Sequence, residues 1–368
     1  AKEPCRNWFY KTACIRELLP RLYIEIALLR CYRFLSDNEY PRLLGRLGSI
    51  IRGIGNPLVA LYARCYLARG GAMVYRDTLH GRPDEGDKGY AVTMFYDYLF
   101  SFNEFEEHHK RLSGITYEEY LHLHSPAVEW LSAYVGQNAP LEVFTAVLQR
   151  YNDFSKSSMV LKHIIDAFEP AHYTDKALAL VALVKQANAS KTTTVMLLES
   201  VGRRFVESPP PEDQRLPLLN EVWKVVTRCE VLAEYVPCAA TWLDVLLQHY
   251  SDREVLVLLQ DVTRHIEQAE PAELDVVALK LEHLVMILIQ HCKTFGGSLL
   301  TSEHLHKLMD CFKAARKVEM CKDLLDSFAK KQEPTNNPIL INTIFDIART
   351  LHDSLDSLSP DGERRHIA

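Results

Sequence analysis

Apolar residues recur along this 368-residue chain at intervals of three and four, which is the period of a helix with one buried face. Sustained alternation of apolar and polar residues, the signal of a half-buried strand, is nearly absent, and no Asn-Gly turn joins two apolar runs. The pattern therefore predicts an all-α protein. The predicted helices cover residues 5–18, 20–35, 40–52, 57–69, 90–108, 126–137, 140–152, 157–168, 174–187, 191–206, 212–228, 230–249, 252–267, 272–292, 302–314, 317–331 and 338–356.

Several breaks between these segments resemble ordinary helix ends. Asn56 followed by Pro57 is typical of an N-cap and a first helical residue, because proline has no N–H to leave unpaired there. The adjacent Gly70 and Gly71 predict that this helix ends after residue 69. Ser251 opens a later apolar run in the same way.

Paired off, the helices repeat about every 40 residues, which is the period of HEAT and armadillo-type arrays. No self-similarity accompanies the period. We therefore expect a HEAT-like α-solenoid of about eight degenerate helical-hairpin repeats, continuous over residues 1–368. The polar stretch GRPDEGDKG, residues 81–89, predicts an exposed loop. Because the chain starts at Ala1 without a methionine, we expect a fragment or a processed chain.

Composition excludes some classes of function. The formal net charge is −6, whereas nucleic-acid-binding domains carry a basic excess. The most apolar run, residues 284–290, is far too short to span a bilayer, so no direct insertion into a membrane is expected. The nine cysteines form no C-x-x-C pair, and we interpret them as reduced thiols in a cytoplasmic protein.

Candidate chemistry is sparse. The histidine pairs at 108–109, 122/124 and 304/306 are adjacent or two apart, whereas helical zinc ligands need a spacing of four. Phosphate loops, dinucleotide-binding loops, nucleophile elbows and metalloprotease motifs are absent, and RGIGNP at 52–57 reads as a tight turn. We therefore predict no catalytic residues, no cofactor and no metal.

One residue does stand out. In LLPRLYIE, residues 18–25, Pro20 suits the first helical position, and Arg21 follows inside the same turn. A cation there is mildly unfavourable because the helix N-terminus carries a positive partial charge. From the residues alone, Arg21 could simply pair with Glu17 or Glu25, at a gain of a few tenths of a kcal/mol. The alternative is that Arg21 serves a binding surface.

These residues resemble a family motif. LPRLYIE at 19–25 is similar to the proline-arginine-leucine-tyrosine motif of the large α-solenoid subunit of retromer and of its retriever paralogue. Similarity to the retriever type in particular extends along the chain, although residues 75–210 diverge. The stretches that carry it are KEPCRNWFYK at 2–11, RGIGNPLVALYAR at 52–64, LNEVWKVVTR at 219–228, KQEPTNNPIL at 331–340 and LHDSLDSLSPDGERR at 351–365.

The resemblance implies a non-enzymatic scaffold of an endosomal cargo-recycling coat, cytoplasmic and peripheral on endosome membranes. It implies that an arrestin-like subunit docks at the N-terminal end, with Pro20, Arg21, Leu22, Tyr23 and Ile24 at or beneath that interface. A sorting-nexin cargo adaptor and an associated coiled-coil complex are implied as further partners, and no nucleic acid. Leu22 and Tyr23 are expected to pack and to orient the helix.

Two alternatives stay open. Another helical-repeat scaffold or transport receptor would share the fold but would not bind an arrestin-fold partner. A helical enzyme with a dispersed site would instead show a deep polar pocket with perturbed ionisable groups, whereas a scaffold shows an extended surface.

Overall fold

The computed structural model describes residues 2–34, 39–79, 88–101, 109, 114–291, 297–330 and 336–352. Over these residues the protein is built from helices, and no β-strand is formed apart from one isolated parallel bridge between Ser157 and Asn188. The predicted all-α solenoid class is confirmed. The α-helices are α1 Lys2–Ala13, α2 Leu18–Leu28, α3 Glu39–Ile51, α4 Pro57–Leu79, α5 Gly89–Phe100, α7 Tyr117–Gly136, α8 Leu141–Phe154, α9 Ser158–Ala167, α10 Ala177–Gln186, α11 Lys191–Glu207, α12 Glu212–Val226, α13 Leu232–His249, α14 Asp252–Glu267, α15 Pro271–His291, α16 Gly297–Leu300, α17 Glu303–Asp310, α18 Ala314–Ala329 and α19 Pro338–His352. Two 3₁₀-helices are η1 Leu29–Phe34 and η2 Pro170–Lys176.

The chain divides into two compact units. The first unit contains residues 1–172 and 183–189, and the second contains residues 173–182 and 190–368. One continuous solenoid over residues 1–368 therefore stays a prediction. Of the predicted loop at 81–89, residues 81–87 lie outside the described residues, and α5 already begins at Gly89.

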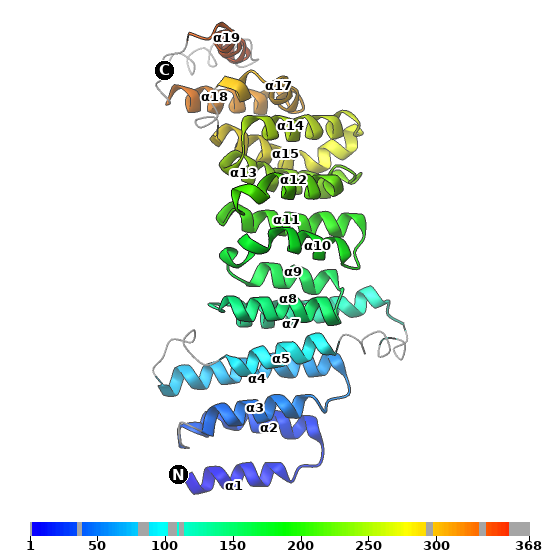
Figure 1. The fold of residues 1–368 in the computed structure, drawn as a ribbon, viewed down its shortest axis with the longest axis vertical. Helices are drawn as coiled ribbons and strands as arrows, with labels where there is room; N and C mark the ends of the chain where they lie inside the picture. Colours follow the sequence, from blue (N-terminus) through cyan, green and yellow to red (C-terminus); the bar gives the residue numbers. More distant parts are fainter. Residues whose placement is uncertain are drawn as a thin grey trace. The chain divides into compact units, whose positions relative to one another are not determined.

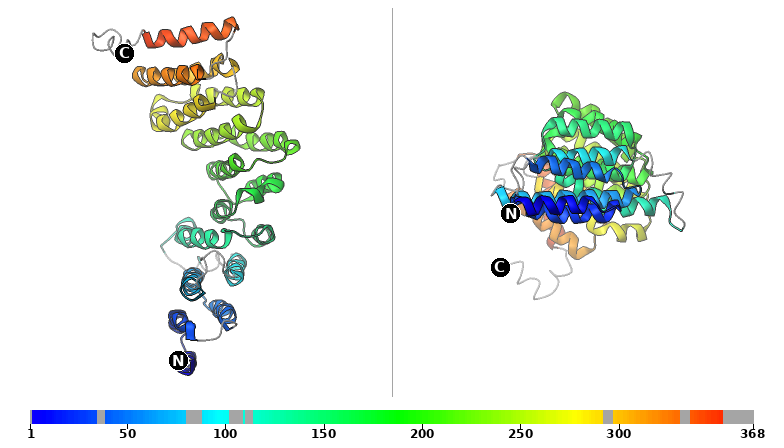
Figure 2. Two further views of the ribbon diagram at one scale, coloured as in Figure 1. Left: turned by 90° about the vertical axis from the view of Figure 1, so that its left-hand side faces the viewer. Right: turned by 90° about the horizontal axis from the view of Figure 1, so that it is seen from below.

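In the first unit the helices stack in two layers (Figure 1). α2, α4, α7 and α9 contact one another in turn and form one layer, while α3, α5 and α8 form the other. In the left view of Figure 2 the blue-to-green helices are seen nearly end-on and alternate between two columns. Each helix therefore buries a face against its own hairpin partner and a second face against the neighbouring hairpin, which explains the broad apolar coverage of the sequence.

The second unit is centred on α13. This helix packs against α11 and α15 on either side and also contacts α12 and α14. Eleven of its residues are buried, among them the fully buried Trp242, whose indole N–H donates to the carbonyl oxygen of Leu198 at 2.9 Å. Among the helices that the structure describes, none combines the length and apolar composition needed to cross a membrane.

Helix starts follow the capping signals of the sequence. The Asn56 side chain accepts hydrogen bonds from the backbone N–H groups of Leu58 and Val59 at 3.0 and 3.1 Å, and α4 begins at Pro57 as predicted. Ser251 and Glu254 form a capping box at the start of α14. These side chains satisfy N–H groups that the first turn of a helix cannot pair by itself.

Several predicted boundaries differ from the structure. The helix predicted over residues 5–18 runs from Lys2 to Ala13, so its predicted end is wrong. Two larger errors concern α4 and α7. α4 does not end at the glycine pair but continues to Leu79. A Cβ on Gly70 would lie 3.1 Å from the Cγ2 atom of Ile26, and a Cβ on Gly71 would lie 2.5 Å from the hydroxyl oxygen of Tyr90. The glycines therefore allow α2 and α5 to approach α4 closely, and this tertiary packing outweighs the roughly 1 kcal/mol that glycine costs within a helix.

The second error concerns α7, which begins at Tyr117 rather than at 126 and runs through Pro126. Thr116 and Glu119 form a capping box there, with the Thr116 hydroxyl accepting from the Glu119 N–H at 3.2 Å. This Thr-x-x-Glu signal is visible in the sequence. The helix tolerates Pro126 because its buried residues pack between α4 and α9.

Candidate functional site

The proline-arginine motif lies in the first half of α2. Glu17 is the N-cap with an extended backbone, and its side chain makes no capping hydrogen bond. Pro20 is therefore the third helical residue rather than the first, but its missing N–H still falls among those that have no partner inside the helix. The Arg21 N–H is the first to be paired, donating to the Glu17 carbonyl oxygen at 3.2 Å.

Arg21 pairs with Glu25, one of the two partners left open by the sequence. The Nε of Arg21 donates to Oε1 of Glu25 at 2.8 Å. The Glu25 side chain is fully buried, whereas 24% of the Arg21 side chain is exposed. A second arginine from the next helix, Arg46 of α3, donates to the other carboxylate oxygen, Oε2. A buried carboxylate needs such partners, because taking an unpaired charge out of water costs several kcal/mol.

The five motif residues do not share one face of α2. Because successive helical residues are about 100° apart, five in a row pass around the whole helix. Leu22 is fully buried in the core, as expected of a packing residue. Pro20 and Ile24 face solvent, and Tyr23 is 37% exposed rather than enclosed in the core. The motif therefore combines one core residue with several that are accessible.

Of the accessible residues, Tyr23 contacts α4, the neighbouring helix of the same layer. The Tyr23 ring contacts the Tyr66 ring, with centroids 5.2 Å apart, and both rings stay partly exposed. A shallow cavity of about 390 Å³ adjoins them between α2 and α4. Its lining residues are Ile26, Ala27, Arg30, Tyr66, Arg69, Gly70 and Met73.

Exposed aromatic rings continue along this layer to α7. The Tyr62 hydroxyl donates to the carbonyl oxygen of Leu123 at 3.2 Å. Trp130 stacks on Tyr134 with ring centroids 5.5 Å apart and an interplanar angle of 4°. Tyr62 and Trp130 are 45% and 39% exposed. Partly exposed, immobilised aromatic side chains of this kind are typical of protein-binding surfaces.

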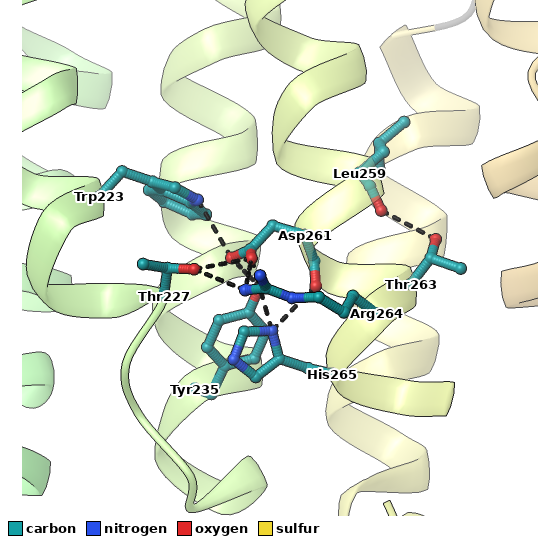
Figure 3. Close-up of polar contacts among 8 residues, drawn as sticks. All are labelled: Trp223, Thr227, Tyr235, Leu259, Asp261, Thr263, Arg264 and His265. Atoms are coloured by element: carbon teal, nitrogen blue, oxygen red, sulfur yellow. Dashed lines mark hydrogen bonds and ion pairs between the residues drawn. The ribbon is translucent and has the colours of Figure 1, made fainter. Parts of the chain in front are cut away.

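A second polar cluster lies in the other unit, around Asp261 of α14 (Figure 3). Its carboxylate accepts hydrogen bonds from Trp223 Nε1 at 3.1 Å, from the Thr227 hydroxyl at 2.8 Å and from the Tyr235 hydroxyl at 2.9 Å, and it also pairs with Arg264. Burial raises the pKa of the Tyr235 hydroxyl, and the nearby Asp261 carboxylate raises it further.

The Asp261 cluster is structural. Its carboxylate is already occupied by donors from α12, α13 and α14, so it has little capacity left for a substrate or a metal. The His265 ring stacks on Tyr235 at 3.9 Å, and its Nδ1 lies 2.8 Å from the Asp261 carbonyl oxygen. An open cavity of about 590 Å³ adjoins the cluster. Both cations and acids line it, and nothing in it resembles a reaction centre.

The histidines singled out in the sequence contact different neighbours where they are described. His124 is fully buried between the rings of Tyr98 and Tyr120, and His306 faces the carbonyl oxygen of Leu300. His108 lies outside the described residues. Within the described ranges, no three His, Cys, Asp or Glu side chains come together as a metal site would need.

Sequence reasoning missed Arg46 as a member of the N-terminal site. The signal that could have found it is Glu25, an acid three residues after Leu22 and next to Ile26, which places it on the buried face of α2. A buried acid in such a position predicts a cation from a neighbouring helix.

Family models match both parts of the chain. A model described as VPS35L matches residues 1–123, and a model described as the VPS35L C-terminal domain matches residues 139–368. The human protein "VPS35 endosomal protein-sorting factor-like" is 32% identical over 377 residues. The proteins of the same description from Danio rerio and Dictyostelium discoideum are each 34% identical, over 383 and 375 residues.

These alignments cover the whole of this chain but only 37–38% of the length of the three relatives. The matches run through the N-terminal motif helix as well as the second unit, so they bear on the sites described above. The chain belongs to the VPS35L family.

Proposed function

We propose that this chain is a non-enzymatic scaffold of a retriever-type coat that recycles cargo from endosomes, and that it docks an arrestin-like subunit through the start of α2. The relatives are named endosomal protein-sorting factor-like, and this supports a role in protein transport at endosomes. The stacked helices support a scaffold, because such arrays present extended binding surfaces. The chain would act in the cytoplasm, peripherally on endosome membranes.

One observation carries the docking proposal. Arg21 is fixed by buried Glu25 while about a quarter of its side chain stays exposed, and Ile24 and Tyr23 are accessible on the same helix. A fixed arginine beside exposed apolar side chains is the composition of an interface hot spot. Its planar guanidinium can bond a carboxylate or carbonyl groups at two places at once, and little entropy is lost because Glu25 already orients it.

The proposal extends to the other partners in general terms. A sorting-nexin cargo adaptor and a coiled-coil complex would join the coat on surfaces other than the docking helix. The exposed aromatic side chains Tyr62, Tyr66 and Trp130 make up an extended surface suited to such contacts.

Replacing Arg21 by alanine tests the docking proposal. Truncation of a hot spot costs about 2 kcal/mol or more, so we expect at least a roughly thirtyfold loss of affinity for the arrestin-like subunit in calorimetric titration. Because Arg21 also pairs with a buried carboxylate, alanine should cost more stability than the roughly 0.5 kcal/mol of an ordinary surface change. A melting curve must therefore show that the variant is folded at the titration temperature.

Arg203→Ala is the matched control. Arg203 forms an i,i+4 pair with Glu199 on α11, outside the first unit. Its replacement by alanine should leave affinity for the arrestin-like subunit unchanged. Unchanged affinity in folded Arg21→Ala would exclude the docking role. A loss that appears only where the variant unfolds would leave Arg21 with a purely structural role.

A further inference from the structure

Two guanidinium groups share one carboxylate at the junction of α2 and α3. Arg21 uses its Nε for Oε1 of Glu25, and Arg46 uses one Nη for Oε2. An arginine has five N–H donors, so most donors of both groups remain for other partners. The side chains of Arg21 and Arg46 are 24% and 45% exposed, whereas Glu25 is fully buried.

The charges at this junction do not balance. Among the residues that the structure describes, two cations pair with one anion here, and because this anion is buried, the exposed side of the pair carries a net positive charge. The surrounding sequence has the same sign. Residues 1–79 contain thirteen Lys and Arg against six Asp and Glu, although the whole chain has a net charge of −6.

We propose that Arg21 and Arg46 together bind one carboxylate of the docked partner, an Asp or Glu side chain, and that Glu25 is the positioning residue that holds the two guanidinium groups side by side. This inference rests on the proposed docking of an arrestin-like subunit and names the group that the subunit supplies. It also gives α3 a role in the interface, although the proline-arginine motif lies only in α2.

The geometry favours a carboxylate. Both arginines are already fixed at one end, so a second carboxylate on the outer side is bound by preorganised donors. Accessible apolar residues of α2, including Ile24, lie close by in sequence and would exclude water on docking. Lower local dielectric strengthens the attraction between the bound carboxylate and the arginine pair.

Glu25 is essential to this arrangement. Without its charge, two guanidinium groups would repel each other, and each would turn toward bulk water instead of toward the partner. With its charge buried and both oxygens used, Glu25 cannot itself contact the partner. It therefore acts only through the arginine pair.

The decisive variant is Arg46→Ala in the 368-residue chain, titrated with the arrestin-like subunit. Hydrogen bonds to charged groups contribute about 1.5–3 kcal/mol, so we expect a loss of roughly tenfold or more in affinity. Arg42→Ala is the matched control, because Arg42 is an exposed arginine one turn earlier on α3 and removes the same charge. It should change affinity by less than about threefold, since it acts only through the screened long-range field.

Salt supplies a second measurement, in which each protein is compared with itself at two salt concentrations. Wild-type affinity should fall when the salt concentration rises from about 0.1 M to 0.5 M, because the Debye length shortens. The fall should be clearly smaller in Arg46→Ala and only slightly smaller in Arg42→Ala, whose charge acts through the long-range field alone. Equal slopes in all three proteins would overturn the inference.

The experiments distinguish a failure of the proposed function from a failure of the arginine-pair inference. If the wild-type chain does not bind the arrestin-like subunit, the proposed function itself fails. If Arg21→Ala weakens binding but Arg46→Ala matches Arg42→Ala, the docking helix stands and the arginine pair is refuted. If Arg46→Ala leaves the subunit's affinity unchanged but abolishes binding to vesicles with anionic lipid, the arginine pair serves a membrane instead.

Discussion

At Asp261, a single carboxylate holds donors from three helices. Its side chain is only 10% exposed, and the Tyr235 hydroxyl that it accepts from belongs to a fully buried residue. Removing the acceptor leaves buried donors unpaired, and each such group costs about 1–3 kcal/mol. The cluster should therefore contribute strongly to the stability of the second unit.

We expect Asp261→Ala to lower the free energy of unfolding by about 3 kcal/mol, because the Trp223, Thr227 and Tyr235 donors all lose their acceptor. The free energy of unfolding is measured by urea denaturation followed by circular dichroism. Asp275→Ala, at an exposed position of α15, is the control and should stay within about 0.5 kcal/mol. Equal losses of stability in the two variants would show that the Asp261 cluster does not stabilise the second unit.

At the residue scale, the sequence predicts a contact within one helix but not the contacts between helices. It identified Arg21 and its possible pairing with Glu25, because both lie in one helix at a spacing of four. It could not identify Arg46, because that contact joins residues 21 apart through the angle between two helices. The Asp261 cluster escaped for the same reason, since Trp223 lies 38 residues from it.

At the scale of single elements, most helices were predictable and their ends were not always so. Local signals such as Asn56 and Ser251 act within one turn, so the sequence shows them directly. Gly71 predicts a helix end that the structure does not have, because its role depends on Tyr90, a residue of another helix. A glycine that ends a helix and a glycine that admits a neighbouring helix look identical in sequence.

Gly136 and Gly45 provide a test of that distinction. A Cβ on Gly136, at the end of α7, would lie 2.4 Å from the backbone oxygen of Ala167, whereas nothing lies within 4 Å of a Cβ on Gly45 in α3. Overpacking costs about 1–3 kcal/mol, so Gly136→Ala should lower stability by at least that amount. Gly45→Ala should raise stability by about 0.5–1 kcal/mol, because alanine restricts the unfolded chain.

Both glycines belong to the first unit, so the two substitutions are compared in one unfolding transition. Thermal melting of the two variants beside the wild type shows whether each substitution raises or lowers stability. A stabilising Gly136→Ala would mean that α7 and α9 separate more easily than their contact suggests.

At the scale of the whole molecule, each unit contains a histidine whose pKa is lowered. Burial lowers the pKa of His163, and Lys162 lowers it further; His163 Nε2 lies 2.9 Å from the Ser125 hydroxyl. Burial and Arg215 likewise lower the pKa of His249 in the second unit. Unfolding restores both to the ordinary value near 6.5, so the unfolded chain binds more protons.

The expected result is a melting temperature that is constant above about pH 6.5 and falls as the pH drops below it. Carboxylates with lowered pKa, such as Glu254, keep their charge in this range and lose it only below about pH 4.5, so they do not contribute. Differential scanning calorimetry between pH 7.5 and 5.5 measures the change. His163→Gln, which cannot titrate, should reduce the fall; an equal fall in that variant would assign the effect to other groups.

The layered packing within each unit also bears on how the protein is made. α2 contacts α4, α4 contacts α7, and α11 contacts α13, so the helices that touch are close in the chain. Contacts between nearby segments close short loops, which costs little entropy and favours fast folding. The first hairpins can therefore pack on the ribosome while the later ones are still being synthesised, and α2 can pack against α3 and α4 before the second unit exists.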